Sequence, residues 1–229
     1  MRFVVGLTVG LVAWSLVANL VIGDLFYTTR NVVLSVLLLL LARRAGFDRS
    51  TLGLSREPAP RGLGWGAAAA LVVACVVAVG VALADAIGPV ATLLGDRRAA
   101  LAPSELAFHT LVRIPLGTAL FEEFAFRGVL LAALLRVTST AWAVGWSSLA
   151  FGAWHVAPTV VALQLNGVDP ASVGGIVTVA GAAAITTIAG LVFCWLRIGS
   201  GSLVAPVLAH WATNSLGLVG AMVAQRGWP

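Results

Sequence analysis

Charge is scarce in this chain of 229 residues, and lysine is absent altogether. Only 10% of the residues are charged, whereas 60% are hydrophobic, and the mean hydropathy is +1.01. Soluble domains carry about 25% charged residues, so this composition excludes an ordinary soluble protein. Several apolar segments approach the length of about 20 residues that a helix needs to cross a bilayer. The sequence therefore predicts an all-α, polytopic transmembrane helix bundle of about 7–8 helices, forming a single integral membrane domain over residues 1–229.

Cysteine is also scarce, and the basic residues are all of one kind. Cys75 and Cys194 lie in apolar segments without a Cys-x-x-Cys spacing, which favours small buried side chains over a metal or redox site. All fourteen basic residues are arginine, which we interpret as the compositional bias of a high-GC bacterial genome. They lie mainly in loops between apolar segments, where they set orientation and contact anionic lipids. We predict membrane lipids as partners, no nucleic acid, and a multi-pass location in a bacterial plasma membrane.

Hydropathy predicts seven membrane spans. Their approximate ranges are 3–22, 31–44, 63–87, 105–135, 140–157, 172–196 and 202–224. The fourth range is too long for one crossing, so we expect an interfacial helix over residues 105–113 and a break near Pro115, which brings the number of helices to eight. The segment from Pro158 to Pro170 is semi-polar and is expected to form a loop or a partly re-entrant element. Residues 43–61 hold five arginines against two acidic residues, so the positive-inside rule places this loop in the cytoplasm.

Two adjacent carboxylates and a guanidinium interrupt the fourth span. Each charge placed in lipid costs about 2.5–3.5 kcal/mol on insertion scales, so such residues indicate a functional site by default. Glu123 and Arg127 are four residues apart and can pair along the helix. Glu122 points about 100° away around the helix and lacks this partner. The run therefore divides into a pair that can neutralise itself and an acid that points elsewhere.

Two further motifs lie on later spans. Phe151 and His155 are four residues apart, as are His210 and Asn214, so each pair shares one helix face. Counted at helical rise from the predicted span ends, Glu122, His155 and His210 lie at a similar depth. Each motif alone could be structural, because histidine and asparagine link membrane helices by hydrogen bonds and a buried ion pair can be architectural. The three motifs together favour a function.

Glu-Glu-x-x-x-Arg, Phe-x-x-x-His and His-x-x-x-Asn, in this order on successive spans, resemble the CAAX protease and bacteriocin-processing family of intramembrane endopeptidases. This family is also called the CPBP or Abi family and includes CAAX prenyl protease 2-like enzymes. The motifs cover residues 122–214, within a motif-bearing catalytic half at about 105–224. The resemblance implies hydrolysis of a peptide bond in a membrane-associated protein or peptide substrate.

The resemblance also implies a role for each motif residue. Glu122 and His155 would activate a water molecule. His210 and Asn214 would stabilise the oxyanion of the tetrahedral intermediate. Glu123 and Arg127 would hold the helix and tune Glu122. The chemistry agrees, because peptide hydrolysis needs a base and donors aimed at developing negative charge.

Several alternatives stay open. One glutamate and two histidines also form a known zinc ligand set, in which Glu122, His155 and His210 would bind zinc or another divalent metal and Glu123 would serve as base. We favour the water-activating glutamate and leave the metal open. A non-catalytic membrane scaffold or bacteriocin-immunity protein of the same fold is a second hypothesis, and a transporter or proton pathway is a third. Serine esterases and zincins lack support, since neither nucleophile motif nor His-Glu-x-x-His occurs.

Overall fold

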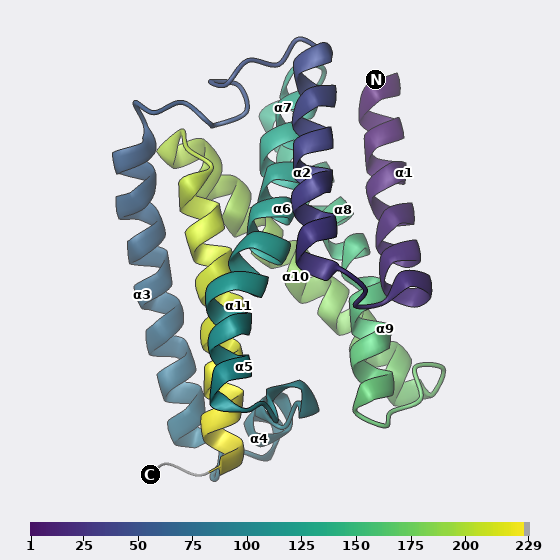
Figure 1. Cartoon of the computed structure of the whole chain (residues 1–229), viewed down its shortest axis with the longest axis vertical. Helices are drawn as coiled ribbons and strands as arrows, with labels where there is room; N and C mark the ends of the chain where they lie inside the picture. Colours follow the sequence, from purple (N-terminus) through teal and green to yellow (C-terminus); the bar gives the residue numbers. More distant parts are fainter. Residues whose placement is uncertain (227–229) are drawn as a thin grey trace.

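The computed structural model describes residues 1–226, which form helices joined by short loops (Figure 1). The first four helical units are α1 (Arg2–Val17) with the π-helical turn η1 (Ala18–Ile22), α2 (Tyr27–Arg44), α3 (Ala59–Leu83) and α4 (Gly88–Leu94). A 3-10 turn η2 (Arg97–Ala99) precedes a long helix made of α5 (Pro103–Phe108), η3 (His109–Ala119), α6 (Leu120–Glu123), η4 (Phe124–Leu130) and α7 (Leu131–Leu135). Three units follow: α8 (Thr140–Trp154) with α9 (Val156–Leu165), α10 (Val173–Ser200) and α11 (Val204–Arg226). No strand occurs within residues 1–226, which confirms the all-α fold. The helical units described above number eight, within the predicted range of about 7–8.

Five helices are long and apolar enough to cross a membrane. They are Arg2–Ile22, Ala59–Leu83, Thr140–Leu165, Val173–Ser200 and Val204–Arg226. The chain is therefore a multi-pass membrane protein. The other two predicted spans are helices of a different character, because α2 contains three arginines and the long helix of residues 103–135 carries the charged motif and mixes α-helical with π-helical turns.

The long helix does not break at Pro115, so this part of the sequence-based prediction is wrong. Residues 103–135 are helical throughout, and Pro115 lies inside the π-helical stretch η3. Proline lacks an N–H, and its ring clashes with the carbonyl four residues earlier in an α-helix. The wider turns of η3, in which the Leu120 N–H bonds the Pro115 carbonyl five residues back, accommodate the proline without a break. The eighth helical unit is α4, and residues 105–113 belong to the long helix.

The segment after the second motif also differs from a loop or re-entrant element. Residues Val156–Leu165 form α9, which continues α8 after a single non-helical residue, His155. Only residues 166–172 form a loop before α10. The histidine of the second motif therefore lies at the junction between two helices rather than inside a regular one.

Figure 1 shows α3 and α11 on one side of the molecule and α1, α8 and α9 on the other, with the long helix and α2 between them. The N-terminus and the loop between α2 and α3 lie at one end. Arg136 donates to the Ala45 and Gly46 carbonyls, and Arg197 donates to the Thr51 carbonyl, so both arginines meet the arginine-rich loop. They lie at the same end of the bundle as this loop. The cytoplasmic location of this end stays a prediction.

The charged motif lies in the centre of the bundle. Every residue from Phe121 to Leu134 is buried, so the middle of the long helix is enclosed by protein on all sides. Asn31 of α2 reaches this helix with a hydrogen bond to the Gly117 carbonyl, 2.7 Å long. Charged residues inside membrane proteins face the bundle interior rather than lipid, and the central position of this helix meets that requirement.

Candidate active site

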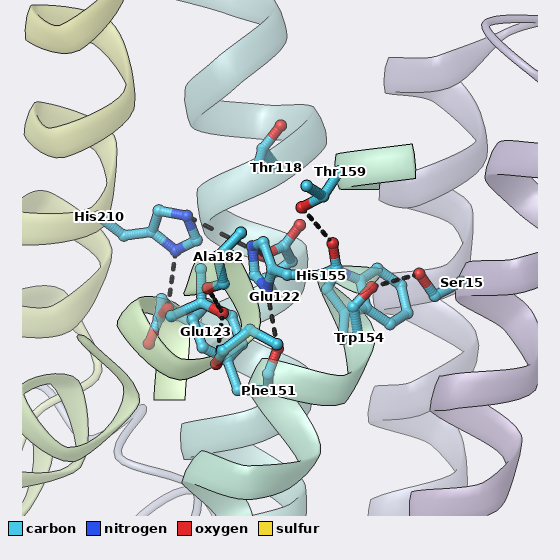
Figure 2. A network of polar contacts seen from close by, with 12 residues as sticks. Ser15, Thr118, Glu122, Glu123, Phe151, Trp154, His155, Thr159, Ala182 and His210 are labelled. Carbon is cyan, nitrogen blue, oxygen red and sulfur yellow. Dashed lines mark hydrogen bonds and ion pairs between the residues drawn. The ribbon is translucent and has the colours of Figure 1, made fainter. Parts of the chain in front are cut away.

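Glu123 is fully buried and connects two helices through one oxygen. Its Oε1 atom accepts a hydrogen bond from Arg127 Nη1 at 3.0 Å and lies 2.8 Å from His210 Nδ1 on α11. An oxygen that already accepts from a guanidinium acts as an ionised acceptor, so the imidazole Nδ1 is the donor. Figure 2 shows His210 reaching toward the two glutamates from its own helix. The i,i+4 pair that the spacing predicts is present, and it also fixes the orientation of His210.

Arg127 is the largest fully buried side chain, and aromatic rings surround it. Its guanidinium carbon lies 4.0 Å from the centre of the Phe151 ring and 5.1 Å from that of Phe193. The Nε and Nη2 atoms have no hydrogen-bond partner. Ring faces attract cations, most strongly where water is excluded. Glu123 and the two rings together therefore hold the positive charge in place.

Glu122 points in a different direction from Glu123 and has no comparable partner. Its side chain is 7% exposed, and its Oε2 atom makes no hydrogen bond. This atom lies 3.7 Å from His155 Nε2 and 3.9 Å from His210 Nε2. These separations are longer than a direct hydrogen bond and are the range in which a bridging water is expected. One unsatisfied carboxylate oxygen thus meets two imidazole nitrogens from two other helices.

The helix junction at His155 fixes which of its nitrogens faces Glu122. The His155 Nδ1 atom lies 2.8 Å from the Phe151 carbonyl oxygen, which can only accept, so Nδ1 donates. In the neutral ring Nε2 then carries the free lone pair, and this nitrogen points to Glu122 (Figure 2). The ring also meets the Phe151 ring edge to face, with centroids 4.4 Å apart. Both residues of the second motif therefore contribute to the orientation of this imidazole.

Asn214 of the third motif and one further histidine lie apart from this cluster. Asn214 is half-buried one turn beyond His210, and its side chain makes no hydrogen bond within residues 1–226. His109, the third histidine, lies in η3 beside Phe108, in the charged surroundings of Asp24 and Arg113. The structure thus brings together Glu122, Glu123, Arg127, Phe151, His155 and His210, and places Asn214 at the edge of the group.

The metal alternative can be compared with this geometry. Two ligand atoms of a tetrahedral zinc site, each about 2.0–2.1 Å from the metal, lie about 3.3 Å apart. The Oε2–Nε2 separations of 3.7 and 3.9 Å are wider. Within residues 1–226, no group of three or more histidine, cysteine or acidic side chains has the geometry to hold a metal ion. The side chains as placed do not fit a zinc site, and we derive the chemistry without one.

Several contacts of the site could not be found by reading motifs. Phe193 of α10 stacks on the His210 ring, with centroids 5.2 Å apart and an angle of 17°. The Tyr27 hydroxyl is 2.9 Å from the Thr118 hydroxyl, one turn before Glu122. A phenylalanine in an apolar span gives no signal of this role. A polar residue near the start of a span, such as Tyr27, gives only a weak one.

Comparison with protein families identifies a match that includes the site. Residues 104–216 match the family described as type II CAAX prenyl endopeptidase Rce1-like. The matched segment begins in α5 and ends in α11, so it contains all three motifs and every titratable residue of the cluster. No curated protein and no solved structure shows significant similarity to the chain.

Proposed function

The chain belongs, through residues 104–216, to the Rce1-like type II CAAX prenyl endopeptidase family, and we propose that it hydrolyses peptide bonds within the membrane by means of water activated by Glu122 and His155. One observation carries this assignment. Inside the matched segment, the buried Oε2 atom of Glu122 has no hydrogen-bond partner and faces the Nε2 atoms of two histidines. An unpartnered carboxylate in a bilayer is expensive, and its retention is best explained by use in chemistry.

The first step is the activation of water. A water molecule in contact with both Glu122 Oε2 and His155 Nε2 would meet two acceptors, because both atoms carry lone pairs in the neutral-imidazole state. Glu122 would take one water proton while the oxygen attacks the carbonyl carbon of the substrate. The C–N bond then breaks, and Glu122 returns the same proton to the leaving nitrogen. The products are a carboxylic acid and an amine, and the enzyme ends in its starting state.

His210 and Asn214 are proposed to stabilise the negatively charged oxygen that forms on the way. Because His210 Nδ1 donates to Glu123, its Nε2 atom can donate only when the ring carries both protons. Asn214 lies one turn along the same face and would add a neutral N–H donor. In this proposal Glu123 and Arg127 act on His210, in addition to holding the helix as the resemblance implied.

The substrate is proposed to be a membrane-associated protein or peptide, because the reacting atoms are enclosed by the bundle. The cell membrane of a bacterium is the proposed location. There the enzyme would mature a peptide or protect the cell from one. Residues 1–229 are proposed to form one integral membrane domain, with the catalytic half at about 105–224.

The decisive experiment compares Glu122→Gln with the wild-type protein in proteoliposomes. The probes are an internally quenched peptide with a prenylated C-terminal CAAX sequence and a mixture of synthetic transmembrane-helix peptides, with products identified by mass spectrometry. We expect cleavage by the wild type and a loss of at least about 1,000-fold in Glu122→Gln, since the variant retains shape and loses the base. His155→Ala should show a comparable loss.

Thr8→Val on α1 is a suitable control, because the Thr8 hydroxyl contacts the Val4 carbonyl and the Trp146 indole and lies outside the cluster. Full activity in both Glu122→Gln and His155→Ala would refute the mechanism. A metal-dependent version would show itself by loss of wild-type activity after dialysis against a chelator and recovery with added zinc. Wild-type protein that binds the probes and never cleaves them would support the scaffold hypothesis instead.

A further inference from the structure

The α8–α9 junction presents a problem of backbone hydrogen bonding. In a regular helix the Trp154 carbonyl would accept from the backbone N–H of residue 158, but residue 158 is proline and has none. The His155 N–H bonds the Gly152 carbonyl at 3.1 Å instead of the Phe151 carbonyl. Two carbonyls next to His155 thus lose their regular donors. Each unsatisfied backbone group inside a bilayer costs several kcal/mol, so other donors are required.

Side chains supply these donors. The Phe151 carbonyl receives the imidazole Nδ1–H of His155, as described above. The Trp154 carbonyl receives the hydroxyl of Ser15 on α1, at 2.6 Å and across 139 positions of sequence. Ser15 is 1% exposed. Figure 2 shows this bond on the side of the junction that faces away from Glu122.

The Ser15 hydroxyl is itself oriented by a neighbour. The side-chain amide of Asn19 lies in the π-helical turn η1 and donates to the Ser15 carbonyl at 2.8 Å and to the Ser15 hydroxyl oxygen at 3.4 Å. The oxygen that accepts from Asn19 leaves its own proton free for the Trp154 carbonyl. The wide turn at the end of α1 thus supports a hydrogen bond at the site on α8.

We propose that Ser15 is a positioning residue for His155, supplied by a helix outside the family-matched segment. By satisfying the Trp154 carbonyl, Ser15 holds the junction in the conformation in which the His155 ring bonds Phe151 and presents Nε2 to Glu122. The Trp154 ring belongs to the same arrangement, because it packs against Phe121 with centroids 5.8 Å apart, one residue before Glu122. This inference rests on the proposed peptidase function for its catalytic consequence.

The chain contains a matched control for this bond. Thr8, one heptad earlier on α1, accepts a hydrogen bond from the Trp146 indole nitrogen at 3.1 Å. This second α1–α8 contact is two turns away from the junction and touches no backbone atom near His155. Thr8→Val therefore removes a bond of the same two helices without changing the hydrogen bonding of the junction.

The activity test is a graded series at residue 15 with the quenched peptide probe. Ser15→Thr keeps the hydroxyl, Ser15→Cys keeps a weaker donor, and Ser15→Ala keeps none. We expect kcat to fall about 10- to 100-fold in Ser15→Ala, less in Ser15→Cys and about threefold or less in Ser15→Thr, with little change in KM. Thr8→Val should retain wild-type kcat. Rates are normalised to protein that elutes as a folded species in detergent.

A second readout does not need activity. The chain has three histidines, so selective nitrogen-15 labelling of histidine gives few ring signals, which His109→Gln and His210→Gln variants assign. We expect Ser15→Ala to shift or broaden the His155 ring nitrogens, with no such change in Thr8→Val. If kcat and the His155 signals are the same across the series, the inference is wrong. A Ser15-dependent His155 spectrum without any wild-type cleavage would support the positioning role and refute the proposed function.

Discussion

Glu123 and His210, 87 positions apart in sequence, share a hydrogen bond of 2.8 Å in the centre of the bundle. The same glutamate oxygen receives Arg127, and the His210 ring rests on Phe193. One carboxylate thus links the long helix to α11 and sets the direction of an imidazole that faces Glu122. The two adjacent glutamates have separate tasks, because Glu123 organises the charges while Glu122 keeps a free oxygen.

Removal of one charge of the buried Glu123–Arg127 pair should lower the free energy of unfolding more than removal of both charges. Glu123→Gln leaves Arg127 without its counter-ion, and breaking a buried pair costs about 3–5 kcal/mol. The double variant Glu123→Gln/Arg127→Met removes both charges of this pair, so its free energy of unfolding should be higher than the sum of the single losses implies. Unfolding in mixed detergent micelles measures Glu123→Gln, Arg127→Met and the double variant. Strictly additive losses would contradict this account of the pair.

Glu122→Gln should not lower the free energy of unfolding, in contrast to Glu123→Gln. The Glu122 Oε2 atom is buried without a hydrogen bond, and a neutral amide removes the desolvated charge and adds a donor for the His155 Nε2 atom. We expect a free energy of unfolding equal to that of the wild type or higher. The thermal midpoint of the purified protein provides the measurement. Equal destabilisation by both substitutions would show that Glu122 is structural.

Gly152 is required for the close approach of α8 and α10. A Cβ atom at this position would lie 2.0 Å from Thr187 Oγ1 and 2.6 Å from the Ala183 carbonyl oxygen, and a backbone atom cannot move aside as a side chain can. Gly152→Ala should therefore cost about 1–3 kcal/mol of stability and displace His155, three residues later. Gly145→Ala is the control, because a Cβ there meets nothing within 4 Å. It should be neutral or stabilising by up to about 1 kcal/mol.

The loop between α2 and α3 should become more susceptible to proteolysis at low pH. Hydrogen bonds from the Thr51 hydroxyl, the Thr51 backbone N–H and the Ser50 hydroxyl lower the pKa of Asp48 to about 2. A carboxyl whose pKa is lower in the folded state than in the unfolded state stabilises the folded state at pH values above its ordinary pKa, which is near 4. This contribution disappears as the pH falls through about 2.

The measurement is pepsin cleavage between Gly46 and Leu54, followed from pH 4 to pH 2. Cleavage should rise over this interval in the wild type. The Asp48→Asn variant should be cleaved readily over the whole range, because its side chain has no charge to lose. A wild-type profile that is flat, or identical to that of the variant, would show that these hydrogen bonds do not hold the loop.

Spacing along one helix predicted the local part of the site. The pairing of Glu123 with Arg127, the separate direction of Glu122 and the shared depth of Glu122 with the two histidines follow from helical geometry and hydropathy. The contact of Glu123 with His210 could not be predicted, because it depends on how two helices are rotated about their axes. The unbroken passage through Pro115 was missed for another reason, since π-helical turns have no sequence pattern as clear as that of a cap.

The position of His155 shows most directly which part of the site the sequence alone cannot predict. Pro158 indicates that a carbonyl four residues earlier loses its donor, so a disturbance at Trp154 could have been expected. The sequence does not indicate that Ser15 supplies the replacement, because a serine in a first membrane span resembles any other small residue there. Only the arrangement of α1 beside α8 connects the two positions.

The Ser15 bond bears on where the chain can be divided. The segment of family similarity begins after α1, α2 and α3. A protein cut at residue 104 would present the Trp154 carbonyl to hydrocarbon, which offers no donor in place of the serine hydroxyl. Its long helix would also lose the amide of Asn31 at Gly117. The start of the family-matched segment is therefore not a boundary at which the protein can be cut. Expression of residues 104–216 alone would yield a helix bundle that lacks the hydrogen bonds supplied by α1 and α2.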